Sequence, residues 1–291
     1  MTEAQHDWNR YVAIGDSFTE GVGDPEPDAP NGLRGWADRV AEVLASTQPD
    51  FAYANLAIRG RLLDRIASEQ LEPALALSPD LITVSAGGND IIRPGADPDA
   101  IAARFEAVVE RLRSDGATVV VFTGVDVQFQ PVFHGMRGRV AIYNEHLRAI
   151  AAAHGCFVAD QWALRSIQRA DMWADDRLHL NAMGHHEVAR MVLDTLDVRH
   201  GLKPMQPEPM RQRAWRQARQ DDLVWARQHL MPWVMRRVRR QSSGDLVTAK
   251  RPDAVSVGST RVMPPIAAIT GAIPIQAVAQ EPEGDQPGTS V

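Results

Sequence analysis

Short apolar runs alternate with longer segments of helical period over residues 11–196. Each run is bounded by turn-forming residues and is apolar at successive positions, as in strands buried on both faces of a parallel sheet. The predicted strands are Tyr11–Gly15, Phe51–Ala57, Leu81–Ala86, Thr118–Gly124 and Cys156–Ala159. The predicted helices are Gly35–Ser46, Arg61–Leu77, Ala100–Ser114, Arg139–His154 and Ala182–Leu196. This alternation predicts an α/β sandwich around a five-stranded, mostly parallel sheet with right-handed crossovers.

The pattern changes after about Val198. The next forty or so residues are rich in arginine and tryptophan, and the chain beyond them is rich in Ser, Gly, Pro and Ala without a lasting period. We therefore predict one domain over residues 1–200, a basic, Trp-containing helical appendage over residues 201–240 and a disordered tail over residues 241–291.

The predicted appendage combines basic charge with an apolar stripe. Between Lys203 and Arg240 there are ten Lys or Arg residues and only three acidic residues. Such a helix either lies weakly on a membrane surface or docks onto the acidic first domain, and we prefer docking. The stripe consists of Leu223, Ala226, Leu230, Trp233, Val234 and Val238.

Composition narrows the class of protein. With 44% hydrophobic and 23% charged residues, the chain has an ordinary globular composition. A net charge of −6 argues against a nucleic-acid partner. The single cysteine, Cys156, excludes an internal disulfide and a thiolate metal cage. The N-terminus lacks the features of a secretory signal, and no stretch approaches the ~18 apolar residues of a membrane span, so we expect a cytoplasmic protein.

Polar motifs follow several of the predicted strands at their carboxyl ends, where doubly wound sheets carry their sites. The motifs are Gly15-Asp16-Ser17-Phe18, Asn55-Leu56-Ala57-Ile58-Arg59-Gly60, Gly87-Gly88-Asn89-Asp90 and Asp176-Arg177-Leu178-His179. Each alone is common turn chemistry. In this order, and each after a different strand, they indicate one site.

These residue types suit nucleophilic catalysis. A serine hydroxyl such as that of Ser17 is a poor nucleophile until a neighbouring base takes its proton. His179 can serve as that base, since imidazole titrates near neutrality. A carboxylate, from either Asp176 or Asp175, can accept a hydrogen bond from the other ring nitrogen and fix the tautomer.

Attack on an ester carbonyl creates an oxyanion that needs preorganised donors. The backbone N–H groups of Ser17 and Gly60 and the side-chain amide of Asn89 can supply them. The sequence therefore predicts a serine hydrolase that cleaves small-molecule carboxylic esters.

The motifs over residues 9–198 resemble those of the SGNH hydrolase superfamily, the GDSL-type esterases and lipases. The resemblance implies a flavodoxin-like, three-layer α/β/α fold and ester hydrolysis through an acyl-enzyme intermediate, and we expect no metal or organic cofactor. It favours Asp176 over Asp175. By position, the nucleophile, the oxyanion donors and the Asp-x-x-His pair are Ser17, Gly60, Asn89, Asp176 and His179. Phe18 stands where the family name records leucine, and either residue can pack beneath the nucleophile.

Nearby polar and aromatic residues have plainer interpretations. Asp16 is expected to anchor its turn. His185 and His186 with Glu187 lack the His-Glu-x-x-His spacing of a metal site, so we expect packing histidines. The loop Asp126–Gly138 either forms a wall of an acyl pocket or merely folds onto the body of the domain.

Several alternative functions remain. A carbohydrate O-acetylesterase, a thioesterase or an acyltransferase would use the same residues. Aromatic residues in the loops favour a fatty-acyl or small aryl ester over a sugar acetate. A flavin- or nucleotide-binding module is disfavoured, because the loop after the first strand is acidic and would repel phosphate.

Overall fold

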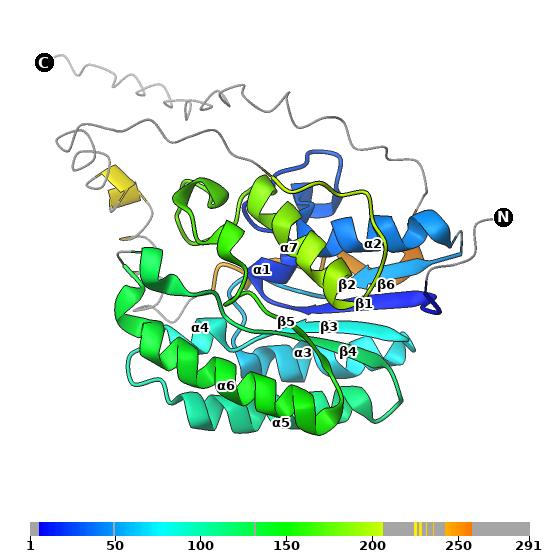
Figure 1. Ribbon diagram of the computed structural model, residues 1–291, viewed down its shortest axis with the longest axis horizontal. Coiled ribbons are helices and arrows are strands. Elements are labelled where there is room, and N and C mark those ends of the chain that lie inside the picture. The colour runs from blue at the N-terminus through cyan, green and yellow to red at the C-terminus, as the bar shows by residue number, and fades with distance from the viewer. Residues whose placement is uncertain are drawn as a thin grey trace, which may run out of the picture. The chain divides into compact units, whose positions relative to one another are not determined.

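The computed structural model contains a six-stranded sheet. Figure 1 shows this sheet between two layers of helices. Five strands are parallel and lie in the order β5-β4-β3-β1-β2, and β6 pairs antiparallel with the outer edge of β2. The strands are β1 (Arg10–Gly15), β2 (Ala52–Asn55), β3 (Leu81–Ser85), β4 (Thr118–Phe122), β5 (Phe157–Ala159) and β6 (Arg251–Ser256). The structure describes residues 6–48, 50–130, 132–205 and 242–257, together with residues 224, 225, 227, 228, 231 and 235.

Helices cover both faces of the sheet. One face carries α2 (Gly35–Thr47) and α7 (Ala182–Thr195). The other carries α3 (Leu63–Ala76), α5 (Pro98–Arg113) and α6 (Arg137–His154). Shorter elements are α1 (Ser17–Glu20), α4 (Gly88–Ile91) and 3-10 turns at Pro30–Gly32, Val127–Phe129, His134–Met136, Arg165–Ile167 and Ala170–Met172.

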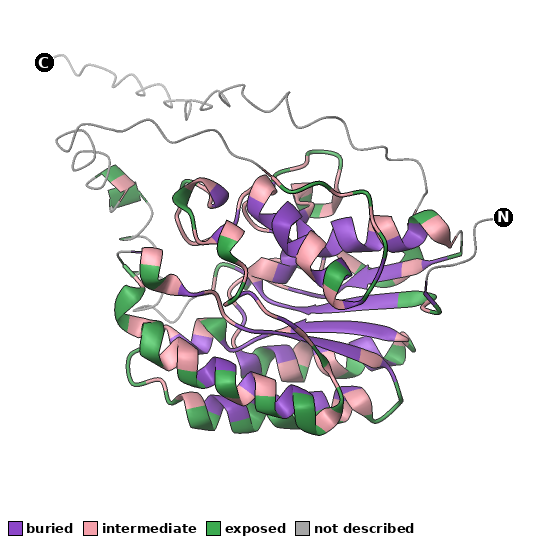
Figure 2. Ribbon diagram, in the orientation of Figure 1, coloured by how far each residue is buried: buried purple, intermediate pink, exposed green. Residues whose placement is uncertain are grey.

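Successive residues of the central strands enter two separate hydrophobic cores. In β1, Val12 and Ile14 pack with the α3, α5 and α6 side, whereas Tyr11 and Ala13 pack with the α2 and α7 side. This two-sided burial, visible in Figure 2, explains why the strands are continuous apolar runs. The expected three-layer α/β/α fold is thereby confirmed, with each predicted strand and helix present within a few residues.

The prediction of five strands and of a disordered tail from residue 241 is wrong for the part that contains β6. None of its residues is buried, because it is an edge strand, and Pro252 within it is a residue that sheets tolerate at their edges. An exposed edge strand that contains a proline shows no hydrophobic period in the sequence. Residues 258–291 lie outside the described residues, as does most of the predicted appendage.

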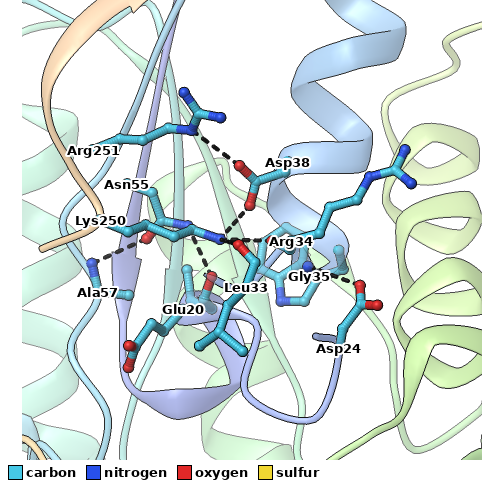
Figure 3. A network of polar contacts seen from close by, with 12 residues as sticks. Glu20, Asp24, Leu33, Arg34, Gly35, Asp38, Asn55, Ala57, Lys250 and Arg251 are labelled. Carbon is cyan, nitrogen blue, oxygen red and sulfur yellow. Dashed lines mark hydrogen bonds and ion pairs between the residues drawn. The ribbon is translucent and has the colours of Figure 1, made fainter. Parts of the chain in front are cut away.

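A buried ion pair fixes β6 to the body of the domain (Figure 3). The side chain of Lys250 is fully buried and its Nζ donates to the Asp38 carboxylate and, at 2.6 Å, to the Arg34 carbonyl. Arg251 donates to the other oxygen of Asp38 at 3.1 Å. Burial lowers the pKa of the Lys250 ammonium, and the neighbouring Asp38 carboxylate opposes that effect. A charge this deep is stable only with such partners.

The strand order places the topological switch point beside β1. The chain leaves β1 toward β2 on one side, and β3 lies on the other side. Crossover helices on opposite faces open a crevice at the carboxyl ends of these strands, where ligands bind in doubly wound sheets. Ser17 follows β1 and Asn89 follows β3 at this position.

Replacing Lys250 with methionine is expected to lower the free energy of unfolding by about 2–4 kcal/mol, because Asp38 loses its buried partner while Arg251 still neutralises part of its charge. Urea denaturation measures this loss. Lys203→Met, at an exposed lysine, is the matched control and should change stability by less than about 0.5 kcal/mol. Equal stability of the two variants would contradict the prediction.

Candidate active site

The turn from β1 into α1 holds Ser17 at the start of a helix. The side chain of the buried Gln70 makes two hydrogen bonds to the backbone of Gly15: it accepts from the Gly15 N–H at 2.8 Å and donates to the Gly15 carbonyl at 2.9 Å. A Cβ on Gly15 would lie 2.7 Å from the Ser85 carbonyl oxygen, so this tight approach requires glycine. Asp16 caps α1 by accepting from the Phe18 N–H at 3.1 Å. The position of Ser17 is therefore fixed by its neighbours on both sides.

A small hairpin brings His179 to this turn. Trp173 and Leu180 form an antiparallel bridge, and the Ala174 N–H donates to the His179 carbonyl at 2.8 Å. Between them, Arg177 has a left-handed backbone with φ of 55°. His179 Nε2 lies 3.0 Å from Ser17 Oγ, although 162 positions separate the two residues.

Asp176 lies behind the imidazole. Its Oδ2 is 2.5 Å from His179 Nδ1, and its Oδ1 accepts the backbone N–H groups of Leu178 and His179 at 2.9 and 3.0 Å. Burial alone would raise the pKa of this carboxyl, but the hydrogen bond and charge of His179, together with the two N–H donors, lower it to about 2. The carboxylate only accepts, so His179 Nδ1 carries hydrogen and Nε2 faces the Ser17 hydroxyl. Of the two candidates, Asp176 contacts the imidazole, and Asp175 is exposed.

Gly60 lies in the loop that follows β2, with a left-handed φ of 74°. The preceding residue, Arg59, donates its backbone N–H at 2.7 Å and its side-chain Nε at 3.0 Å to the carboxylate of Glu20. The Glu20 side chain is fully buried at the end of α1. Glu20 thus joins the helix that starts with Ser17 to the Gly60 loop (residues 58–61), a role that the sequence did not reveal.

Asn89 bridges the same two segments. Its Nδ2 donates to Asp16 Oδ2 at 2.8 Å and to the Arg61 carbonyl at 3.1 Å. Burial raises the pKa of Asp16 to about 6, although the Phe18 N–H, His179 and Asn89 stabilise its charged form. Asp16 is thus a turn anchor, as expected, and also a partner of Asn89.

These groups open onto a cavity of about 670 Å³ lined by Ser17, Gly60, Asn89 and His179. One wall is apolar and comes from the loop after β4, the first turn of α6 and the hairpin: Val125, Val127, Phe133, Met136, Val140 and Trp173. The loop Asp126–Gly138 lines this cavity with Phe133 and Met136, and its Phe129 packs on Trp173 at 5.6 Å, so it does more than fold onto the body of the domain; that the cavity takes an acyl group stays a prediction.

The other candidate residues have structural roles. His185 is buried, accepts from the Trp36 N–H at 3.2 Å and has its pKa lowered to about 4 by burial. His186 contacts the Lys203 carbonyl at 2.8 Å. No group of three metal-ligating side chains occurs among the described residues. Phe18 packs on Trp36 at 5.4 Å, as expected of a residue beneath the nucleophile's turn.

The predicted appendage is described only in part. Trp225 lines the cavity and stacks under the Arg177 guanidinium at 4.8 Å. All six residues of its apolar stripe lie outside the described residues, so docking and membrane contact both remain predictions. Within the parts that the structure describes, no helix has the length and apolar character needed to cross a bilayer.

Comparisons with known proteins agree with this fold. The model of the GDSL-like lipase/acylhydrolase family matches residues 13–187. No curated protein matches the sequence significantly.

Solved structures share the fold at low identity. LAE5, an α/β hydrolase enzyme from the metagenome of Lake Arreo in Spain, is 21% identical over 65% of this chain and 95% of its own, with a TM-score of 0.55. Axe2, an acetylxylan esterase from Geobacillus stearothermophilus, is 19% identical over 66% and 96%, with a TM-score of 0.53. TesA is 20% identical over 64% and 97%, with a TM-score of 0.54.

The lowered pKa of Asp176 makes a prediction about stability. A folded-state pKa of about 2 lies below that of an unfolded aspartate, so the carboxylate stabilises the fold above about pH 4, and this contribution disappears as the pH falls from 4 to 2. Asp176→Asn should therefore cost about 1–2 kcal/mol at pH 7, allowing for partial solvent exposure.

Chemical denaturation of Asp176→Asn and wild type across this pH range measures the difference. Asp175→Asn, at the exposed neighbour, is the matched control and should follow wild type throughout. A constant gap between Asp176→Asn and wild type from pH 7 to pH 2 would show that the ionisation of Asp176 is not its source.

Proposed function

Because the chain belongs to the GDSL-like lipase/acylhydrolase family, we propose that it hydrolyses carboxylic esters with Ser17 as nucleophile, His179 as base and Asp176 as the carboxylate that orients the base. The observation that carries this proposal is the continuous chain of contacts from Ser17 Oγ to His179 and on to Asp176 at the cavity. The 3.0 Å distance from Ser17 Oγ to His179 Nε2 suits transfer of the hydroxyl proton to the imidazole, whereas the contact with Asp176 holds the ring in place.

In the proposed reaction, Ser17 Oγ attacks the ester carbonyl carbon while His179 Nε2 takes the hydroxyl proton. The tetrahedral intermediate then collapses, and His179 returns that proton to the departing alcohol. An acyl ester remains on Ser17. Water, deprotonated by His179, attacks this ester, and as the second tetrahedral intermediate collapses His179 returns the proton to Ser17 Oγ, which releases the acid and the free serine.

The oxyanion formed in each half-reaction is stabilised by N–H donors. Ser17, Gly60 and Asn89 all line the cavity, and we assign this role to the backbone N–H groups of Ser17 and Gly60 and to the Asn89 amide. Asn89 already donates to Asp16 and to the Arg61 carbonyl. As third donor it exchanges the longer bond, to Arg61, for a bond to the oxyanion.

The size and lining of the cavity favour an acyl group larger than acetate. A volume of about 670 Å³ is typical of sites for drug-sized ligands. The apolar wall formed by Phe133, Met136 and Trp173 suits an alkyl or aryl group better than a sugar. Deacetylation of a carbohydrate, the activity named for Axe2, is the alternative.

Ser17→Ala should reduce kcat/KM for p-nitrophenyl esters by at least about 10³-fold, because no other group replaces the attacking hydroxyl. Spectrophotometric rates on purified protein measure the effect. Ser68→Ala, at an exposed serine of α3, is the matched control and should leave the rate unchanged. A wild type as inactive as Ser17→Ala on every ester would refute the proposed function.

The same esters with acyl chains from acetyl to decanoyl test the substrate class. We expect kcat/KM to rise by about tenfold between acetyl and a chain of medium length, since each buried CH₂ contributes up to about 0.8 kcal/mol. Faster hydrolysis of acetylated xylan than of any longer ester would instead favour carbohydrate deacetylation.

A further inference from the structure

We propose that residues 242–257, here called the C-terminal segment, are part of the catalytic site and hold the Gly60 loop where its N–H can donate to the oxyanion. This inference rests on the proposed function. The C-terminal segment lies beyond the family match, which ends at residue 187. It nevertheless borders the cavity beside Gly60 through Ser242, Ser243 and Asp245.

Two glycines allow the backbones of the segment and the loop to touch. A Cβ on Gly60 would lie 2.6 Å from Ser242 Oγ and 3.1 Å from Ser243 Oγ. Conversely, a Cβ on the buried Gly244 would overlap the Arg59 carbonyl oxygen and lie 2.7 Å from Ile58 Cγ2. The turn at residues 242–245 therefore packs directly on the backbone of the Gly60 loop.

Polar contacts hold the turn on both sides of Gly60. Ser242 Oγ donates to the Arg59 carbonyl at 3.4 Å, and Asp245 pairs with Arg61 Nη1 at 3.3 Å. The other Asp245 oxygen accepts from the Ser242 N–H at 2.9 Å and closes the turn itself. One contact precedes Gly60 in the chain and the other follows it, so the loop is restrained at both of its ends.

The loop is held from its other side by the helix of the nucleophile. Glu20 binds the N–H and the guanidinium of Arg59. Ile58 donates its N–H to the Gly15 carbonyl at 3.3 Å. Gly60 itself has no side chain with which to pack, and an oxyanion donor loses its effect when displaced by about 1 Å. The position of the Gly60 N–H must therefore be restrained by residues on both sides of the loop. The C-terminal segment supplies the restraint on one of these sides.

The far end of the segment is anchored firmly. Lys250 and Arg251 both bind Asp38 of α2, and β6 pairs along β2, the strand that leads into the Gly60 loop (Figure 3). The turn at residues 242–245 is therefore connected to the rigid part of the domain. Gly244 and Asp245 act as positioning residues, because neither takes part in a bond-forming step.

Gly244→Ala tests this inference, since its methyl group forces the turn away from Arg59. Gly201→Ala is the matched control, because a Cβ there meets nothing within 4 Å. Loss of a whole oxyanion donor costs about 10²–10³ in kcat, so we expect kcat to fall about 10- to 100-fold in Gly244→Ala. KM should stay within about threefold, because the Gly60 N–H contributes mainly to the transition state.

A second readout separates positioning from stability. Phenylboronic acid forms a tetrahedral adduct on the nucleophilic serine that needs the oxyanion donors, so its inhibition constant should rise by about tenfold or more in Gly244→Ala. If Gly244 had only a structural role, Gly244→Ala would have a lower melting temperature, but its kcat and its inhibition constant for phenylboronic acid would equal those of Gly201→Ala. Either that result, or a fall in kcat without weaker inhibition, would overturn the inference.

Asp245→Ala decides the matter if Gly244→Ala does not fold, because the Asp245 side chain is 44% exposed and its removal spares the core. Here we expect kcat to fall by about three- to tenfold, with a matching loss of boronate affinity. Unchanged kinetics would again overturn the inference. An active wild type that depends on Ser17 but not on these residues refutes only the role of the segment, whereas a wild type inert on every ester refutes the proposed function and this inference with it.

Discussion

The turn from β1 into α1 is the constraint on which the candidate site depends, because the segments that carry His179, Asn89 and Gly60 all bond to it. Gln70 of α3 grips Gly15, and Asn89 of α4 binds Asp16. Asn55 at the end of β2 donates to the Thr19 carbonyl at 2.9 Å. Buried polar groups are costly unless paired, so each bond specifies one arrangement of two distant segments. The buried hydrogen bonds that pair these polar groups within the fold thus also position the residues around Ser17.

Two carboxylates near the imidazole acquire opposite properties from their surroundings. Asp176 accepts from His179 and from two backbone N–H groups, and its pKa falls to about 2. Asp16 is more deeply buried, and its pKa rises to about 6. The first stays ionised and fixes the orientation of His179, whereas the second serves the geometry of the turn and of Asn89. The difference in environment, rather than residue type, separates the two roles.

The sequence predicted what depends on local pattern. The strands of the parallel sheet are continuous apolar runs because both faces are covered, and the site motifs follow them directly. It did not predict β6, since an edge strand with exposed side chains and Pro252 carries no hydrophobic period. Glu20 looked like one more acidic residue in a loop. The structural roles of Glu20 and Lys250 depend on partners far away in the sequence, and a single sequence does not show such contacts.

The position of β6 has a further physical consequence. Without it, β2 would be the edge of the sheet, with one side of its backbone unpaired. β2 is also the strand that leads into the Gly60 loop. Strand ends at an unpaired edge open locally at little cost in free energy, whereas paired inner strands do not. By pairing with this edge, β6 gives the start of the Gly60 loop the rigidity of an inner strand. The Gly60 loop and the turn at residues 242–245 that packs on it are therefore both held by β6.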